Sequence, residues 1–307
     1  MAKKKFDIDN HDDVTTNNGF EDIDISSTPI EEMENVNGLT DNEIKDPNDI
    51  KVTIEDEKTP IVVMFGPPSC GKTMVLVRLT RYLRKLGFRV EPERTFRPSA
   101  DVDYKKICDD FNEVVTNEYA AKSTKLINFM LLKVWKKGSP ICQILEAPGE
   151  HYYNPNRGAS NEEFPRYINN IFNKNNRKIF LIIVEPQWDG DSLNYVERIK
   201  QLKVKMRGND KVIILYNKID QTNFVISSGK TNIRQAIKSV SDKYNGIFES
   251  FKNEIPIVRF FTPYNCKFVP FSTGDYNETT NGNFAYEASP EEYPSNLWNE
   301  IMKCIKG

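Results

Sequence analysis

The stretch that most constrains how this chain can fold is residues 60–73, PIVVMFGPPSCGKT. Its first half, Ile61–Phe65, is an apolar run of β-strand character, and the residues after it carry apolar side chains at helical spacing up to Leu86. Between the two lies the pattern G-x-x-x-x-G-K-[ST], made of Gly66, Pro67, Pro68, Ser69, Cys70, Gly71, Lys72 and Thr73. This pattern, placed between a buried strand and an amphipathic helix, predicts a phosphate-binding loop.

The chemistry of such a loop gives each residue type a role. Gly66 and Gly71 permit a tight turn that aims backbone N–H groups at an anion beside the N-terminus of the following helix. The Lys72 ammonium supplies positive charge for the β- and γ-phosphates of a nucleotide, and the Thr73 hydroxyl is a suitable ligand for Mg²⁺. We therefore expect all eight loop residues to line a nucleotide site, and Lys72 to take part in catalysis.

Other apolar runs predict the architecture around this loop. Ile179–Val184, Val212–Tyr216 and Cys266–Phe271 have the length and composition of strands, the first two fully apolar. Leu126–Trp135 and Pro140–Leu145 flank a short glycine-containing loop, which indicates an antiparallel hairpin. The expected helices are 73–86, 104–115, 164–172, 193–206, 233–251 and 297–305, with a loop up to about residue 283 after the last strand. Alternating strands and helices predict a three-layer α/β/α sandwich, its sheet mostly parallel with one antiparallel hairpin strand.

The first 57 residues differ in composition from the rest. They contain 17 Asp and Glu against 5 Lys and Arg, without sustained apolar periodicity, so we expect a disordered acidic tail. Since the whole chain carries a formal charge of −2, residues 58–307 carry +10 and are expected to form one nucleotide-binding domain. Nucleic acid would suit this charge, but no basic run interleaved with aromatic residues supports that partner.

The cysteines and the longest apolar runs bear on where the chain works. Five widely spaced cysteines, odd in number and without a C-x-x-C pair, favour reduced thiols and a cytoplasmic location. The apolar runs have strand length, and none is long enough for a helical membrane span.

Two further motifs follow predicted strands. Glu146-Ala147-Pro148-Gly149 ends the hairpin, where Glu146 is placed to hold Mg²⁺ or its water and Gly149 to offer a backbone N–H to the γ-phosphate. Asn217-Lys218-Ile219-Asp220 directly follows the run Val212–Tyr216. A carboxylate there can accept from both N1–H and N2–H of guanine, whereas adenine would leave it unpaired.

The remaining residues of these loops complete the predicted site. Asn217 is expected to tie its loop to the phosphate loop, and the stem of Lys218 to lie along the base. Ser272 and Thr273 follow the last predicted strand, where their backbone N–H groups would meet the guanine O6. A strand-ending turn without function is an equally good interpretation of these two residues.

The segments GPPSCGKT, EAPG, NKID and FSTG, in this order, resemble the first, third, fourth and fifth motifs of the Ras-like (TRAFAC, translation-factor-related) P-loop GTPases. The resemblance covers about residues 60–273, and EAPGEHYY with PPSCGKT is also similar to bacterial double-GTPase-like domains. It implies the P-loop NTPase fold, GTP or GDP with Mg²⁺ as ligands, and an effector or activating protein as partner.

The resemblance also implies a switch loop with a threonine that binds Mg²⁺ in the triphosphate state. Thr124 is our candidate because it lies two residues before the hairpin's first apolar run, and Ser123, Thr116 and Thr95 remain alternatives. The interval between the first and third motifs is longer than in minimal relatives, so we expect an insertion in switch I around residues 91–121.

The position after Gly149 departs from the family pattern. Relatives that hydrolyse GTP well place Gln or His there to orient water, whereas this chain has Glu150 followed by His151. We expect Glu150 or His151 to act in catalysis in its place. Because a γ-phosphate repels a carboxylate, the expected intrinsic rate of hydrolysis is low. Three arginines of the switch segments could add positive charge: Arg94, Arg97 and Arg157. The alternative function is a scaffold that holds the nucleotide with little or no hydrolysis; the NKID motif disfavours an ATP-using kinase.

Overall fold

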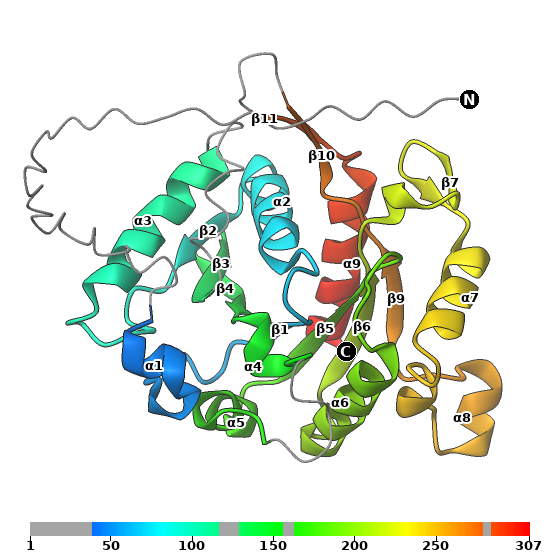
Figure 1. Cartoon of the computed structure of the whole chain (residues 1–307), viewed down its shortest axis with the longest axis horizontal. Coiled ribbons are helices and arrows are strands. Elements are labelled where there is room, and N and C mark those ends of the chain that lie inside the picture. The colour runs from blue at the N-terminus through cyan, green and yellow to red at the C-terminus, as the bar shows by residue number, and fades with distance from the viewer. Residues whose placement is uncertain (1–38, 117–128, 156–162, 279–283) are drawn as a thin grey trace, which may run out of the picture. The chain divides into compact units, whose positions relative to one another are not determined.

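The computed structural model describes residues 39–116, 129–155, 163–278 and 284–307. Its centre is a seven-stranded sheet with the order β2-β3-β4-β1-β5-β6-β9 (Figure 1). The strands of this sheet are β1 Ile61–Phe65, β2 Arg89–Pro92, β3 Met130–Lys136, β4 Ser139–Glu146, β5 Lys178–Val184, β6 Lys211–Tyr216 and β9 Lys267–Pro270.

Strand β1 lies at the middle of the sheet and pairs in parallel with both β4 and β5, and the pairs β5–β6 and β6–β9 are also parallel. Of the seven strands of this sheet, β3 alone runs in the opposite direction, antiparallel to β4 and β2. Strands β1 and β5 are buried along their whole length and β6 along nearly all of it, which is why their sequences are continuous apolar runs. The predicted sheet is confirmed.

Helices cover both faces of the sheet. In Figure 1, α2, α3 and α9 lie on one side and α5, α6 and α7 on the other. These helices are α2 Lys72–Lys85, α3 Val102–Thr116, α5 Arg166–Asn173, α6 Ser192–Lys205, α7 Ile233–Lys243 and α9 Glu292–Lys306. One continuous hydrophobic core joins the sheet to both layers. The chain therefore has the three-layer P-loop NTPase fold, with the phosphate loop between β1 and α2.

Residues 39–57, which we call the strap, are ordered, and this corrects the prediction that the acidic tail extends to residue 57. The strap contains helix α1 (Asp41–Lys45) and a 3₁₀ turn, η1 (Pro47–Asp49). The Thr40 side chain accepts from the backbone N–H of Glu43 while Glu43 accepts from that of Thr40, which stabilises the start of α1. Leu39, Ile50 and Ile54 are 3–5% exposed and belong to the core. The prediction from average composition missed these three core residues because acidic residues surround them in the sequence. Residues 1–38 of the predicted tail lie outside the described residues.

Three further segments differ from the sequence prediction. The helix expected over 233–251 ends at Lys243, because Gly246 adopts a left-handed backbone (φ 87°) and the chain continues into a 3₁₀ turn, η4 (Glu249–Phe251). Residues 89–92, where no strand was expected, form the edge strand β2. The loop expected up to about residue 283 contains an antiparallel hairpin, β10 (Gly274–Glu278) and β11 (Phe284–Ala288).

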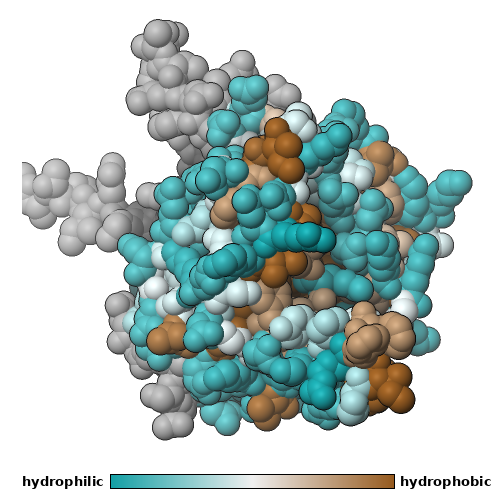
Figure 2. Space-filling model, turned by 90° about the vertical axis from the view of Figure 1, so that its right-hand side faces the viewer, coloured by the Kyte–Doolittle hydropathy of each residue, from teal (hydrophilic) through white to brown (hydrophobic). Residues whose placement is uncertain are grey.

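The remaining elements are short. They are α4 Gly149–Tyr152, η3 Ile219–Gln221, β7 Val225–Ser227, β8 Lys230–Thr231 and α8 Pro256–Phe261. Helix α8 exposes Ile257, Phe260 and Phe261 at 75–83%. Figure 2 shows the face that carries α7 and α8, where apolar groups stand out from largely hydrophilic surroundings. No helix in the described part of the chain is long and apolar enough to cross a membrane.

Helix α3 fills much of the segment expected as a switch I insertion. It packs against α2 and β2 and buries the predicted apolar face with Ile107, Phe111, Val114 and Val115. Residues 117–128 lie outside the described residues, so the assignment of the whole of 91–121 to an insertion stays a prediction.

Candidate nucleotide site

The phosphate loop leaves β1 at Phe65 and enters α2 at Lys72. Two of its residues adopt a left-handed backbone, Ser69 (φ 61°) and Gly71 (φ 85°), and Gly71 is the residue that caps α2. A Cβ at Gly71 would lie 2.6 Å from Nδ2 of Asn217, and one at Gly66 would lie 2.6 Å from Sγ of Cys70. The left-handed backbone at Gly71 favours glycine there, and at Gly66 an added Cβ would have to displace the Cys70 thiol.

The polar groups of this loop can hold an anion. Pro67 and Pro68 have no N–H, so the amide donors of the loop come from residues 69–73. The Lys72 ammonium is buried and donates to Pro67 O (3.0 Å) and Gly66 O (3.3 Å). A polyphosphate would take over these two hydrogen bonds, because its oxygens are charged and the two carbonyls are not.

Glu146 and Thr73 meet beside the loop because β4 and β1 are neighbouring parallel strands that end at the same edge of the sheet. The Thr73 hydroxyl donates to Oε1 of Glu146. The Glu146 carboxyl is fully buried, and burial raises its pKa to about 7 against the opposing effects of the Thr73 hydrogen bond and the Lys72 charge.

These two side chains fit a Mg²⁺ ion. Oε2 of Glu146 is buried and has no hydrogen-bond partner among the described residues, and hydroxyl and carboxylate oxygens are the ligands that Mg²⁺ prefers. The described residues contain no group of three or more His, Cys, Asp or Glu that could hold a metal.

Gly149 packs directly against the phosphate loop. A Cβ on Gly149 would lie 2.3 Å from Pro68 N and 2.5 Å from Pro67 C, both backbone atoms that cannot rotate away. Backbone therefore meets backbone where α4 begins. The glycine predicted to face the γ-phosphate lies beside the loop that would bind it.

The two predicted catalytic residues after Gly149 lie in different environments. Glu150 is exposed, whereas His151 is 8% exposed and its Nδ1 lies 2.7 Å from the hydroxyl of Tyr167. Burial, reinforced by the Lys72 ammonium, lowers the pKa of His151 to about 4, so its imidazole is neutral. Both residues line a cavity of about 500 Å³ between the strap, α4 and α5. Their catalytic roles stay predictions.

The NKID loop reaches the phosphate loop, as expected. Asn217 Nδ2 donates to Cys70 O (3.0 Å), and Oδ1 of the same buried side chain has no hydrogen-bond partner in the described part of the chain. Lys218 has a left-handed backbone (φ 55°) and its ammonium forms an ion pair with Glu185. Asp220 is exposed at the tip of this loop, in η3.

The loop after β9 lies beside the NKID loop. Ile219 N donates to Phe271 O (3.0 Å), which places the buried Ser272 and the half-buried Thr273 near the turn that carries Asp220. Sequence reasoning missed Glu185. Its signal was a polar residue directly after the buried run of β5, at the strand edge where the other site residues gather.

The structure describes only some of the candidate switch threonines and arginines. Thr124, Ser123 and Arg157 lie outside the described residues. Of the alternatives, the Thr95 hydroxyl donates to Oε1 of Glu93 (2.7 Å) and the Thr116 hydroxyl to Asn112 O (2.8 Å).

The two described switch arginines are already paired. Arg97 is 3% exposed and pairs with Glu43 of the strap (2.7 Å) and with Asp101 (2.8 Å). Arg94 pairs with Asp109 at the surface. Arg97 therefore holds the strap rather than reaching towards a phosphate.

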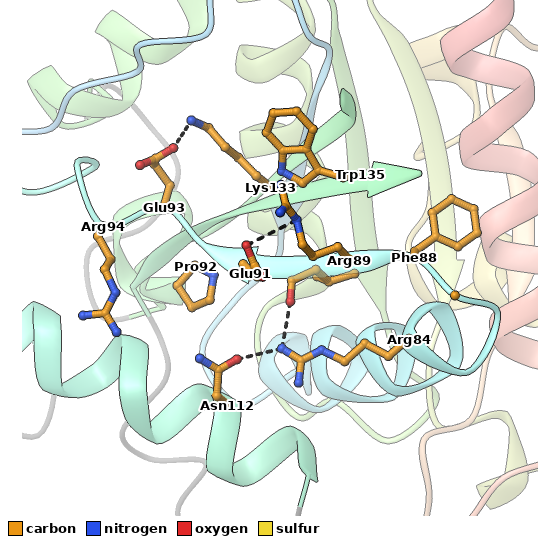
Figure 3. Close-up of a pocket in the computed structure, with 12 residues that line it drawn as sticks. Arg84, Phe88, Arg89, Glu91, Pro92, Glu93, Arg94, Asn112, Lys133 and Trp135 are labelled. Carbon is orange, nitrogen blue, oxygen red and sulfur yellow. Dashed lines mark hydrogen bonds and ion pairs between the residues drawn. The ribbon is translucent and has the colours of Figure 1, made fainter. Parts of the chain in front are cut away.

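A larger cavity, of about 830 Å³, lies elsewhere, beside β2 (Figure 3). Several of its charged side chains are bonded to other residues of the cavity wall: Arg84 Nη2 donates to Val90 O (2.7 Å) and to Asn112 Oδ1 (2.7 Å), and Lys133 forms an ion pair with Glu93. Arg94, one of the candidate switch arginines, lines this cavity, whereas no residue of the predicted phosphate loop or of the EAPG, NKID and FSTG segments does.

No protein-family model matches the sequence, and no similar curated protein was found. The fold is similar to that of a protein described as nucleolar GTP-binding protein 1 from Plasmodium falciparum (TM-score 0.41, 14% identity, 82% of this chain and 90% of that one). It is also similar to the S. cerevisiae Ski7 GTPase-like domain bound to GDP and inorganic phosphate (0.42, 13%, 81% and 51%). A third is translation elongation factor SelB from Methanococcus maripaludis with the GTP analogue GPPNHP (0.35, 12%, 83% and 35%).

The chain thus spans about half of the Ski7 structure and about a third of the SelB structure. The strand order and the phosphate loop between β1 and α2 define the fold of this chain.

Proposed function

We propose that the chain binds GTP and GDP with Mg²⁺ and hydrolyses GTP slowly to GDP and phosphate. The observation that carries this proposal is the hydrogen bond from Asn217 Nδ2 to Cys70 O (3.0 Å), because it joins the NKID loop and the phosphate loop into one continuous site. A polyphosphate at one end and a purine at the other would contact loops from neighbouring strands of the same sheet edge.

At the phosphate end, the chain's own groups supply positioning and positive charge. The amides of residues 69–73 surround the phosphates, and Lys72 exchanges its two carbonyl partners for β- and γ-phosphate oxygens. Mg²⁺, when bound, neutralises charge that develops on the phosphates, and Thr73 and Glu146 are the residues that would hold it. Water attacks the γ-phosphorus as the bond to the β–γ bridging oxygen breaks.

At the base end, Asp220 supplies the choice of purine. Its carboxylate accepts from N1–H and N2–H of guanine, and the backbone N–H groups at Ser272 and Thr273 face O6. The hydrogen bond between Ile219 N and Phe271 O supports this arrangement because it holds the two loops together.

The test is calorimetric titration of the chain with Mg·GTP and with Mg·ATP. We expect GTP to bind more tightly, Lys72→Ala to abolish binding, and Asp220→Ala to weaken GTP about tenfold to a hundredfold while leaving ATP unchanged. Lys218→Ala is unsuitable as a control because Lys218 pairs with Glu185 inside the site; Lys238→Ala, on the exposed surface of α7, is suitable. Equal affinity for GTP and ATP would reject the guanine assignment.

A second function, a module that holds the nucleotide and hardly hydrolyses it, is favoured by the residues after Gly149. His151 is buried, neutral and bonded to Tyr167, and Glu150 is exposed to solvent. A single-turnover assay with GTP separates the two functions. Phosphate release within hours that is lost in Lys72→Ala supports the slow GTPase, and no release above that variant supports the holding module.

The location and the protein partner belong to the same proposal. The five cysteines are free thiols, four of them buried, which supports a reducing compartment such as the cytoplasm. An activating protein that adds a water-orienting or positively charged group would raise the rate, since neither Glu150 nor Arg97 offers one.

A further inference from the structure

The hairpin β10–β11 returns the chain onto the loop that is proposed to face the base. Ser289, one residue after β11, donates from its hydroxyl to Ser272 O (2.6 Å), and the Tyr286 hydroxyl donates to Thr273 O (2.5 Å). Two successive carbonyls of the loop are thus bonded to side chains of β11 and of the residue that follows it.

The turn into the hairpin, at Gly274, is closely packed. Gly274 has φ 108°, and a Cβ there would lie 2.2 Å from Glu287 O and 2.7 Å from Ser289 N. Gly274 N also donates to Ser272 Oγ (3.2 Å). The returning strand is therefore in direct backbone contact with the loop that it holds.

Two arginines of α2 back up these contacts. Arg78 is 5% exposed and donates from Nη2 to Ser289 O (2.6 Å) and from Nε to Ser289 Oγ (3.3 Å). The guanidinium of Arg81 lies over the ring of Tyr286, 4.9 Å from its centre. A buried guanidinium is costly unless its donors are bonded, and among the described residues no carboxylate forms an ion pair with Arg78. Its hydrogen bonds to Ser289 are what compensate its burial.

Fixing a carbonyl also fixes an N–H, because the two lie in one planar trans peptide and point in opposite directions. Ser289 holds Ser272 O, so the Thr273 N–H points away from the hairpin. Tyr286 holds Thr273 O, so the Gly274 N–H is turned towards Ser272 Oγ, where it is bonded. The hairpin thereby aims one donor of the loop, the Thr273 N–H.

We propose that Ser289, Tyr286 and Arg78 are positioning residues for recognition of the 6-oxygen of the purine, acting through the Thr273 N–H. This inference rests on the proposed function. The helix whose N-terminus holds the phosphates also sets the orientation of the amide that reads the base, so one element fixes both ends of the nucleotide.

The test uses Ser289→Ala and Tyr286→Phe in the full chain, each of which removes one hydroxyl. Ser250→Ala and Tyr264→Phe are matched controls, since they remove hydroxyls that bond to Gly246 O and Glu249 outside the site. Calorimetric dissociation constants are measured for GDP, IDP and ADP with Mg²⁺ and for inorganic tripolyphosphate. IDP keeps the 6-oxygen and lacks the 2-amino group, and ADP lacks the 6-oxygen.

We expect the two hairpin variants to weaken GDP and IDP by the same factor, about five- to tenfold, with tripolyphosphate within twofold of the unaltered chain. Asp220→Ala should instead weaken GDP more than IDP. Hairpin variants that bind GDP and IDP like the controls would overturn the inference, and so would an equal loss of tripolyphosphate binding, which indicates a structural role alone. If the unaltered chain binds GDP and ADP equally, the proposed function fails and this inference with it.

Discussion

The Glu146 side chain is one methylene longer than the aspartate that P-loop NTPases commonly place near Mg²⁺. The extra length brings Oε1 to the Thr73 hydroxyl, and Oε2 is buried with no hydrogen-bond partner within residues 39–116, 129–155, 163–278 and 284–307. An unsatisfied buried polar atom costs about 1–3 kcal/mol. A cation, or a water bound to one, would remove that cost, so the unsatisfied oxygen of Glu146 favours binding of such a ligand.

Glu146→Gln should therefore uncouple nucleotide binding from the metal. The amide has about the same volume as the carboxyl but no negative charge, so Mg²⁺ should no longer tighten GTP binding, a loss of about tenfold or more. The measurement is titration of GTP with Mg²⁺ and again with EDTA. Glu146→Asp is the control and should keep part of the metal effect; a Gln variant with the full Mg²⁺ effect would contradict the role of Glu146.

His151 should stay neutral to well below its ordinary pKa of 6.5, because burial and the Lys72 ammonium lower its pKa to about 4. The folded protein then resists protonation that the unfolded chain accepts. The stability contributed by His151 is complete above pH 6.5 and is lost as the pH falls from 6.5 towards 4.

Imidazole NMR shifts against pH test this prediction. The chain has two histidines, so the variant His11→Ala leaves the single signal of His151. A titration midpoint near 6.5 would show that the ring is solvated and that its contact with Tyr167 does not persist in solution.

At the scale of elements, the sequence predicted the helices and strands whose position follows from a single pattern, such as a continuous apolar run. The apolar runs of β1, β5 and β6 had to be buried strands, and each is. Strand β2 was missed because an edge strand alternates, and here the exposed Arg89 and Glu91 flank a buried Val90 in the manner of a loop. The end of α7 was missed because Ile247 and Phe251 keep helical spacing and are buried, although the chain between them is not an α-helix.

In the candidate site, too, some residues could be predicted from the sequence and others could not. Residues with a fixed chemical role, such as Lys72, Glu146 and Asn217, lie together at one sheet edge, as predicted from their places after strands. The supporting residues Arg78 and Ser289 come from a helix and a hairpin that are 211 residues apart in the sequence. No local pattern in a single sequence connects two such positions.

Gly149→Ala tests the contact between α4 and the phosphate loop. The added Cβ would lie 2.3 Å from Pro68 N, so α4 has to move away. We expect GTP to lose affinity relative to GDP by about tenfold, since only the γ-phosphate lies at this contact. Gly208→Ala is the matched control because a Cβ at Gly208 meets nothing within 4 Å. Equal losses for GTP and GDP in competition titrations would contradict the assigned contact.

At the scale of the whole described fold, the strap links regions that the sequence keeps apart. Its Glu43 pairs with Arg97 in the segment after β2, and Thr53 N donates to Phe96 O (2.8 Å) in the same segment. Its Asn48 accepts from the backbone N–H of Arg166 at the start of α5 (3.0 Å). The strap is thus a structural part of the nucleotide-binding fold.

Glu43→Gln should destabilise the fold, because Arg97 would remain buried with Asp101 as its one remaining carboxylate. We expect a loss of about 1–3 kcal/mol in the free energy of unfolding, measured by urea denaturation. Glu57→Gln is the control within the same strap, since its ion pair with Lys174 is exposed and should contribute less than about 1 kcal/mol. Equal losses in the two variants would show that burial of the Arg97 pair is unimportant.

Backbone contact between Gly149 and Pro68 has a consequence for how far a local shift can spread. Two residues beyond Gly149, His151 is bonded to Tyr167, and the N–H of the neighbouring Arg166 is held by Asn48 of the strap. No side-chain rotation can absorb movement at the first of these joints. A displacement of the strap must therefore either break the His151–Tyr167 or the Arg166–Asn48 hydrogen bond, or move Gly149 with it.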